Sequence, residues 1–122
     1  MRVLPRRFRP HTIQLIRQLG EDDNGIANQM KITIRHVKVD SNYGMQQSKL
    51  GISTDYKIIV YIELGDYTAY DEKGHVLYYG QDFYIKVDDV IRFQESDYTV
   101  TGLGEIFIDS ENPVRLEVTA NE

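Results

Sequence analysis

The hydrophobic positions of this chain recur at every second residue over several stretches. These runs are Ile13, Leu15 and Leu19; Met30, Ile32 and Ile34; Ile58, Val60, Ile62 and Leu64; and Val114, Leu116 and Val118. Alternation at period two places apolar side chains on one face of a β-strand, whereas a helix repeats every 3.6 residues. The pattern therefore predicts strands with one buried face, and no segment has the pattern of a convincing amphipathic helix.

The alternation changes parity within "MKITIRHVKV" (residues 30–39). Ile32 and Ile34 fall on one face, but Val37 and Val39 fall on the other. One extra residue near His36 returns all four side chains to a common face, and a β-bulge inserts such a residue. We therefore predict a bulge or sharp bend at residues 35–36.

Turn signals divide the rest of the chain into short apolar runs. The turns are "EDDNG" (21–25), "DEKG" (71–74) and "SENP" (110–113), and the later runs are "HVLYY", "FYIKV", "VIRF", "YTVT" and "EIFID". Gly102 and Gly104 separate the last two runs and predict a kink or turn. About seven to eight mainly antiparallel strands at this spacing predict an all-β fold, a small single-domain β-barrel or sandwich. We place the barrel domain at residues 11–122, after a basic N-terminal arm at residues 1–10.

The stretch "VDSNYGMQQSKLGIS" (39–53) separates two of the predicted strands without any sustained alternation. An ordinary hairpin connection uses two to five residues. We interpret residues 40–54 as one long inserted loop, which is either slack or the working part of the molecule.

Charge is distributed unevenly along the 122 residues. The net charge is −5, yet residues 1–20 contain five arginines (Arg2, Arg6, Arg7, Arg9 and Arg17) and no acid. The remainder holds nine of the fourteen Lys and Arg and all nineteen acids. A basic arm on an acidic body suits contact with nucleic acid, an acidic protein surface or another copy of the chain. The acidic body itself argues against a nucleic-acid groove, because phosphate contacts require Lys and Arg.

Candidate catalytic and metal-binding chemistry is sparse. The three histidines are scattered, the chain has no cysteine, and neither "EDDN" nor "VDDV" has the ligand spacing of a calcium loop. "GLGE" lies between predicted strands rather than before a helix, where a phosphate loop is found. We therefore expect no enzyme activity, no catalytic residues, no metal and no cofactor. No apolar run approaches the ~20 residues of a membrane helix, and the N-terminus lacks the apolar core of a signal peptide.

Tyrosine is abundant, with nine copies, and the segment "AYDEKGHVLYYGQDFY" (69–84) contains a cluster of aromatic residues. The cluster contains Tyr70, Tyr78, Tyr79, Phe83 and Tyr84. Aromatic rings serve as stacking platforms in oligonucleotide-binding barrels, but only beside a basic groove. Here Asp71, Glu72 and Asp82 are the neighbours. Cross-strand pairing and a protein interface are therefore favoured over nucleic-acid binding.

Three segments together resemble a known family. "FRPHTIQLIRQLGEDDNG", "VKVDSNYGMQ" and "DYKIIVYIEL" are similar to the small minor capsid proteins of siphophages and prophages of Gram-positive bacteria. The resemblance covers about residues 8–95 and consists of strand patterns and turns. These proteins belong to the head–tail connector group and are stopper-like. The resemblance implies a small β-barrel that assembles as a hexameric or dodecameric ring beneath the portal and adaptor proteins. That ring closes the DNA channel after packaging and provides the tail-docking platform.

The resemblance also implies roles for residues, because a long loop of such stoppers projects into the channel. Only residues 40–54 fit that position, and the gating candidates are Tyr43, Gly44, Met45, Lys49, Leu50, Gly51 and Ile52. Candidates for the subunit or adaptor interface are Arg6, Arg7, Phe8, Arg9, Tyr78 and Tyr79.

The expected partners are other copies of the chain, the portal and adaptor above, and the tail terminator or tail tube proteins below. Double-stranded DNA is expected to pass through the channel without sequence-specific binding, and no membrane is involved. The expected location is the virion neck, after assembly in the host cytoplasm. A tail-completion or terminator protein and an oligonucleotide-binding β-barrel are the alternatives, and a β-barrel enzyme ranks last.

Overall fold

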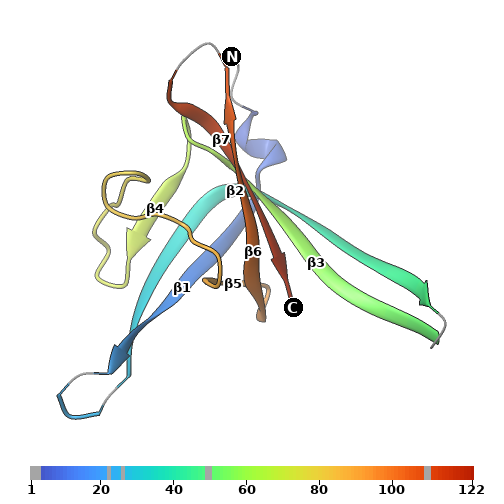
Figure 1. Cartoon of the computed structure of the whole chain (residues 1–122). Coiled ribbons are helices and arrows are strands. Elements are labelled where there is room, and N and C mark those ends of the chain that lie inside the picture. Colours follow the sequence, from blue (N-terminus) through green and yellow to red (C-terminus); the bar gives the residue numbers. More distant parts are fainter. Residues whose placement is uncertain (1–3, 22, 26, 49–50, 109–110) are drawn as a thin grey trace.

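The computed structural model describes residues 4–21, 23–25, 27–48, 51–108 and 111–122, of which residues 27 and 42–56 are described by their backbone. The described chain forms one antiparallel sheet after a single turn of 3-10 helix (Figure 1). Its elements are η1 (Arg6–Phe8), β1 (His11–Glu21), β2 (Ala27–Ser48), β3 (Gly51–Glu63), β4 (Thr68–Asp71), β5 (Val90–Phe93), β6 (Ser96–Phe107) and β7 (Pro113–Asn121). The prediction of a small all-β fold is confirmed.

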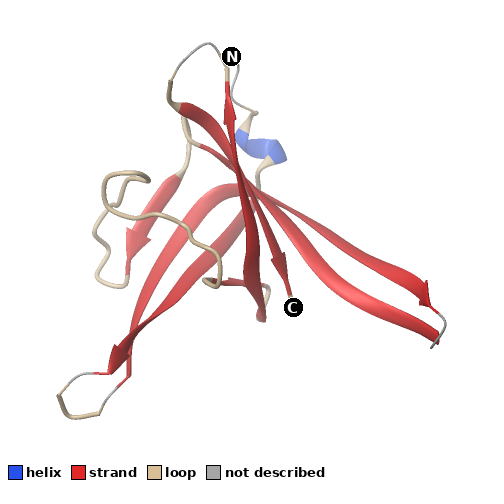
Figure 2. Ribbon diagram, in the orientation of Figure 1, coloured by secondary structure: helices blue, strands red, loops and turns tan. Residues whose placement is uncertain are grey.

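Hydrogen bonds between neighbouring strands form a ring. The strands follow one another as β1-β5-β6-β7-β3-β2, and the pairing of β1 with β2 closes the circle. β4 is the seventh strand and pairs with β2 beside that ring. Closure of the ring removes free sheet edges where its described strands pair on both sides. Figure 2 shows these strands and the loops that join them.

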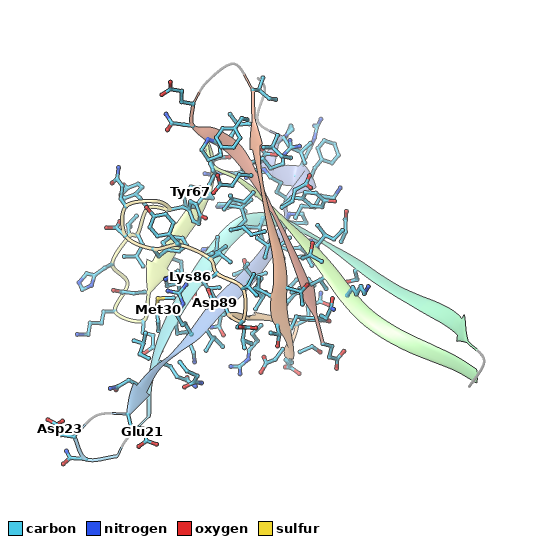
Figure 3. The ribbon with its side chains drawn as sticks, in the orientation of Figure 1. Glu21, Asp23, Met30, Tyr67, Lys86 and Asp89 are labelled. Atoms are coloured by element: carbon cyan, nitrogen blue, oxygen red, sulfur yellow. The ribbon has the colours of Figure 1, made fainter. Side chains whose placement is uncertain are left out.

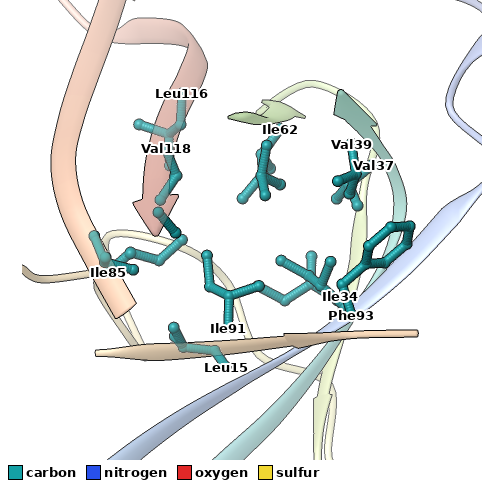
Figure 4. Packing of buried hydrophobic residues seen from close by; sticks show 14 of the residues in the cluster. Leu15, Ile34, Val37, Val39, Ile62, Ile85, Ile91, Phe93, Leu116 and Val118 are labelled. Carbon is teal, nitrogen blue, oxygen red and sulfur yellow. The ribbon is translucent and has the colours of Figure 1, made fainter. Parts of the chain in front are cut away.

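The core fills the interior of this ring with aliphatic side chains from alternate positions. Leu15, Ile34, Ile62, Leu116 and Val118 are among its fully or almost fully buried members (Figure 4). Burial of an aliphatic side chain of this size contributes roughly 1.5–3 kcal/mol. The four alternating runs of the sequence therefore meet in one hydrophobic core.

A bulge in β2 returns its side chains to the core. His36 has a φ of 64°, in the left-handed region. The pairing of β1 with β2 shifts register between His11 and Thr12, which lie opposite Val37 and Arg35. Ile34 and Val37 are both fully buried as a result. The predicted bulge is confirmed.

β2 is 22 residues long and continues beyond the barrel in both directions. At one end it pairs with β1 in a ribbon whose tip carries Glu21 and Asp23 (Figure 3). At the other end it pairs with β3 without interruption from Lys38↔Tyr61 to Ser48↔Gly51. The expectation of an unpatterned loop at residues 40–54 is therefore wrong, because most of that stretch is a paired two-stranded ribbon. The sequence of this stretch lacks the hydrophobic alternation of the other strands, although its described backbone is paired as two strands.

Several local expectations also need correction. The runs at residues 75–79 and 83–87 are not strands but parts of a loop, where the isolated bridges are Tyr70↔Val76 and Tyr79↔Phe83. Residues 98–107 belong to the single strand β6, in which a register shift between Val100 and Gly102 gives the expected kink rather than a turn.

Two side chains differ from their expected environment. Leu19 is 60% exposed, because it lies where β1 has already left the barrel. Glu63 alternates with the core-facing Ile62 yet is also buried, since Arg115 donates a 2.6 Å hydrogen bond to its carboxylate.

Candidate interaction surfaces

The N-terminal segment lies against its own barrel. Arg9 is only 1% exposed, and its guanidinium donates hydrogen bonds to the backbone carbonyls of Leu4, His36 and Asp66. Its Nη2 also donates to Asp66 Oδ2 at 2.6 Å. These bonds join the N-terminal segment, the bulge of β2 and the turn between β3 and β4. Arg9 was predicted to contact a neighbouring subunit, but here its donors are used within the chain.

Arg6 completes this cluster, which we call the Asp66 clasp (Arg6, Arg9 and Asp66). Its Nε and Nη2 donate to the two carboxylate oxygens of Asp66 at 3.0 and 2.8 Å. Hydrogen bonds from Arg6 and then Arg9 hold the pKa of Asp66 well below its usual range. Two of the five arginines at the start of the chain therefore pair with a carboxylate of the same chain.

Arg7 and Phe8 are the members of η1 that point away from the clasp. Phe8 is 50% exposed, and the Arg7 guanidinium lies 4.8 Å from the centre of its ring. Arg7 is exposed and forms no salt bridge with the described residues. The predicted interface residues of this segment therefore separate into Arg6 and Arg9, which hold the segment on the barrel, and Arg7 and Phe8, which are exposed and available for contact.

The loop between β4 and β5 is held on the barrel by a second ion pair. Asp89 is 4% exposed and accepts bonds from Arg17 Nε and Nη2, both at 2.7 Å. It also accepts a hydrogen bond from the amide of Lys86, while Arg17 donates to the carbonyl of Tyr84. Figure 3 shows Lys86 and Asp89 near each other on this loop. The pair fixes the position of the aromatic residues that precede it.

Two of those aromatic residues, Tyr79 and Tyr84, line a pocket of about 400 Å³ together with Tyr67 from the turn before β4. We call it the tyrosine pocket; its lining is Leu64, Tyr67, Tyr79, Gly80, Gln81, Tyr84, Glu105, Asn112 and Pro113. The amide of Tyr79 donates to the Tyr67 hydroxyl at 2.6 Å, and the Tyr79 and Tyr84 rings meet edge to face at 5.6 Å. Burial, followed by the charge of Glu105, raises the pKa of Tyr79. The pocket thus combines aromatic faces with one carboxylate and contains no basic side chain in its lining.

Tyr78 lies beside this pocket rather than in it. It is 58% exposed and, with Val76, lines a neighbouring depression that shares Leu64 and Tyr67 with the tyrosine pocket. The two predicted interface tyrosines are therefore close, but only Tyr79 lines the tyrosine pocket. Sequence reasoning did not identify Tyr67 and Glu105, which come from the turn before β4 and from β6.

The histidines have local structural roles. His11 Nδ1 accepts a bond from the Val39 amide, His75 pairs with Asp71 in a turn, and His36 forms the bulge. Burial, followed by the charges of Arg6 and Arg35, lowers the pKa of His36. Within the described residues, no group of three His, Cys, Asp or Glu is placed to hold a metal ion.

The gating candidates are the residues about which the structure says least. Lys49 and Leu50 lie outside the described residues. The backbone alone is described for Tyr43, Gly44, Met45, Gly51 and Ile52. Their backbone positions, apart from residues 49–50, are in the β2–β3 ribbon.

No family model matches the chain, and no curated protein matches it. In the described part of the chain, no helix is long and apolar enough to cross a membrane.

Proposed function

We propose that this chain is a structural component of the neck of a tailed phage, a stopper-like head–tail connector. Copies of it form a ring that closes the DNA channel after packaging and provides the platform for tail docking. The resemblance of residues 8–95 to minor capsid proteins supports this function. So does an architecture in which ribbons extend from a small closed barrel. On this proposal the chain acts by assembly and not as an enzyme, and it resides in the virion neck.

One observation carries the proposal: β2 belongs to the barrel and to both ribbons. Residues 42–48 pair with β3 along one edge, and their other edge has no strand partner within the described chain. A two-stranded ribbon alone is marginally stable in water at best. Ribbons of this kind gain stability by packing on other subunits, which is what neighbouring copies in a ring supply.

The gate is assigned to the tip of the β2–β3 ribbon, where the sequence candidates are located. Pairing continues as far as Ser48↔Gly51, so the gate is a ribbon and not a loose loop. Opening then moves the ribbon as a unit, with bending where it leaves the barrel near Val39 and Ile58. Hinges at element ends are a common means of such movement.

The acidic balance of the chain supports a channel through which DNA passes without being held. The net charge is −5, and residues 21–122 hold nine Lys and Arg against nineteen Asp and Glu. Lys and Arg contacts to phosphate supply most non-specific DNA affinity. A wall poor in such contacts lets the duplex slide.

Electron microscopy of particles from the encoding phage with this gene deleted tests the proposal. Leaking heads without tails are the expected result. Sealed, full heads beside unattached or overlong tails would instead favour the tail-terminator alternative. Ordinary infectious virions would overturn the assembly function altogether.

A further inference from the structure

We infer that the tyrosine pocket binds the Arg7 side chain of a second copy of this chain, with the Phe8 ring beside it. This contact rests on the ring assembly proposed above and identifies the two surfaces that meet between neighbouring subunits.

The pocket has the chemistry of a cation site. Tyr67, Tyr79 and Tyr84 line it, and the faces of aromatic rings carry a negative electrostatic potential that attracts ammonium and guanidinium groups. Glu105 adds a full negative charge, and it is exposed without an ion pair to the described residues. Burial, followed by the charge of Glu105, raises the pKa of Tyr79, which is consistent with a carboxylate close to this ring. One guanidinium group can pair with the carboxylate of Glu105 and stack on an aromatic ring at the same time.

Arg7 is the arginine of the N-terminal segment that suits this site. Arg6 and Arg9 are used by the Asp66 clasp, whereas Arg7 is exposed and already stacked on Phe8. The clasp holds η1 in place before any contact forms. A group fixed in advance loses less conformational entropy on binding than one on a mobile arm.

Within one copy, Arg7 does not line the tyrosine pocket, and its guanidinium lies over the ring of Phe8. When the contact between Arg7 and the pocket repeats from one copy to the next, it produces a ring if the rotation between the copies closes, as the proposed ring assembly requires.

A charge exchange in the full-length protein tests the contact. Amide NMR spectra recorded from micromolar to millimolar concentration detect self-association even when it is weak. We expect concentration-dependent shifts at Arg7, Phe8, Tyr79, Tyr84 and Glu105. Arg7→Glu and Glu105→Arg should each weaken self-association by at least about tenfold, and the double variant should restore it.

The matched controls reverse the charge of a residue on the exposed turn that contains Glu72 and Lys73. The variants Lys73→Glu and Glu72→Arg should leave the association unchanged. Thermal unfolding checks that every variant is folded. Shifts that map to other surfaces, no concentration dependence at all, or no rescue by the double variant would each overturn the inference. Particles with intact necks despite Arg7→Glu would also overturn it while leaving the proposed function in place.

Discussion

The guanidinium of Arg9 lies against the carboxylate of Asp66, with Nη2 2.6 Å from Oδ2, although the two residues are 57 positions apart. The contact is buried on the arginine side, whereas the side chain of Asp66 is 32% exposed. It joins the start of the chain to the turn after β3. The basic segment from Leu4 onward is consequently packed on the barrel that follows it.

Replacing Arg9 with methionine is expected to lower the free energy of unfolding by about 3 kcal/mol. The change removes a buried charge from its partner and leaves the carbonyls of His36 and Asp66 without this donor. Arg6 still pairs with Asp66, which keeps the loss at the lower end of the range for buried pairs. Urea unfolding measures it. Arg7→Ala, two residues earlier in η1, is the control and should change stability by less than about 0.5 kcal/mol.

Acid should weaken the Asp66 clasp. The carboxyl has an ordinary pKa of 3.8, and its pKa in the folded protein is lowered by hydrogen bonds from Arg6 and then Arg9. The unfolded chain therefore binds a proton first as the pH falls, so this contribution is complete above about pH 5 and is lost progressively below it. Unfolding curves from neutral pH to about pH 2 should fall less steeply for Asp66→Asn than for the natural protein. Equal slopes would mean that the clasp contributes nothing, and added salt should reduce the difference, because Asp66 is partly exposed.

His36 provides a test of the bulge. Its φ of 64° suits glycine and disfavours β-branched residues. His36→Gly should change the free energy of unfolding by less than about 1 kcal/mol, whereas His36→Val should cost about 2 kcal/mol. Arg35→Val, at the preceding strand position, is the control and should have little effect. A tolerated valine at position 36 would show that the chain does not need the left-handed conformation there.

The loop between β4 and β5 should loosen when Asp89 is replaced. Asp89→Ala leaves Arg17 without its bidentate partner and the Lys86 amide without its acceptor, at an expected cost of about 3 kcal/mol. Hydrogen exchange at Lys86 should accelerate, because that amide loses its bond. Asp97→Ala removes an exposed pair with Arg92 and should cost no more than about 1 kcal/mol. Similar losses for both variants would contradict a special role for the buried pair.

Sequence reasoning succeeded wherever one face of a strand is buried. Ile13, Leu15, Ile58 and Val60 alternate because every second position enters the core, and the change of parity between Ile34 and Val37 disclosed the bulge. These signals are local. Each needs only neighbours in the chain and the two-residue period of a strand.

The failures have equally physical causes. The β2–β3 ribbon was interpreted as a loop because residues 40–54 show no alternation of apolar and polar side chains, although the described backbone there pairs as two strands. The partners of Arg9 and Arg17 lie 57 and 72 residues away, and composition gave no hint of either. Phe83 and Ile85 have strand-like spacing but are buried as anchors of a loop. Contacts between residues that the closed barrel brings together produce no repeating pattern along the sequence, so sequence reasoning does not detect them.

The last prediction concerns the β2–β3 ribbon, which should be dispensable for folding and needed for channel closure. Asn42 pairs directly with Lys57, so residues 43–56 can be replaced by an Asn-Gly turn that joins these two positions in register. Val39 and Ile58 remain in place, and the free energy of unfolding should change by less than about 1 kcal/mol, because the core is retained. Gln18 pairs with Gln29, so the same replacement of residues 19–28 shortens the other ribbon as a matched control. Particles with the short β2–β3 ribbon should leak DNA, as measured by nuclease sensitivity of the packaged genome, and the control particles should not. Because both variants keep the barrel, leakage from the first alone would assign closure to that ribbon. If particles with either shortened ribbon retain their DNA, the β2–β3 ribbon is not the gate, because the channel then stays closed without it.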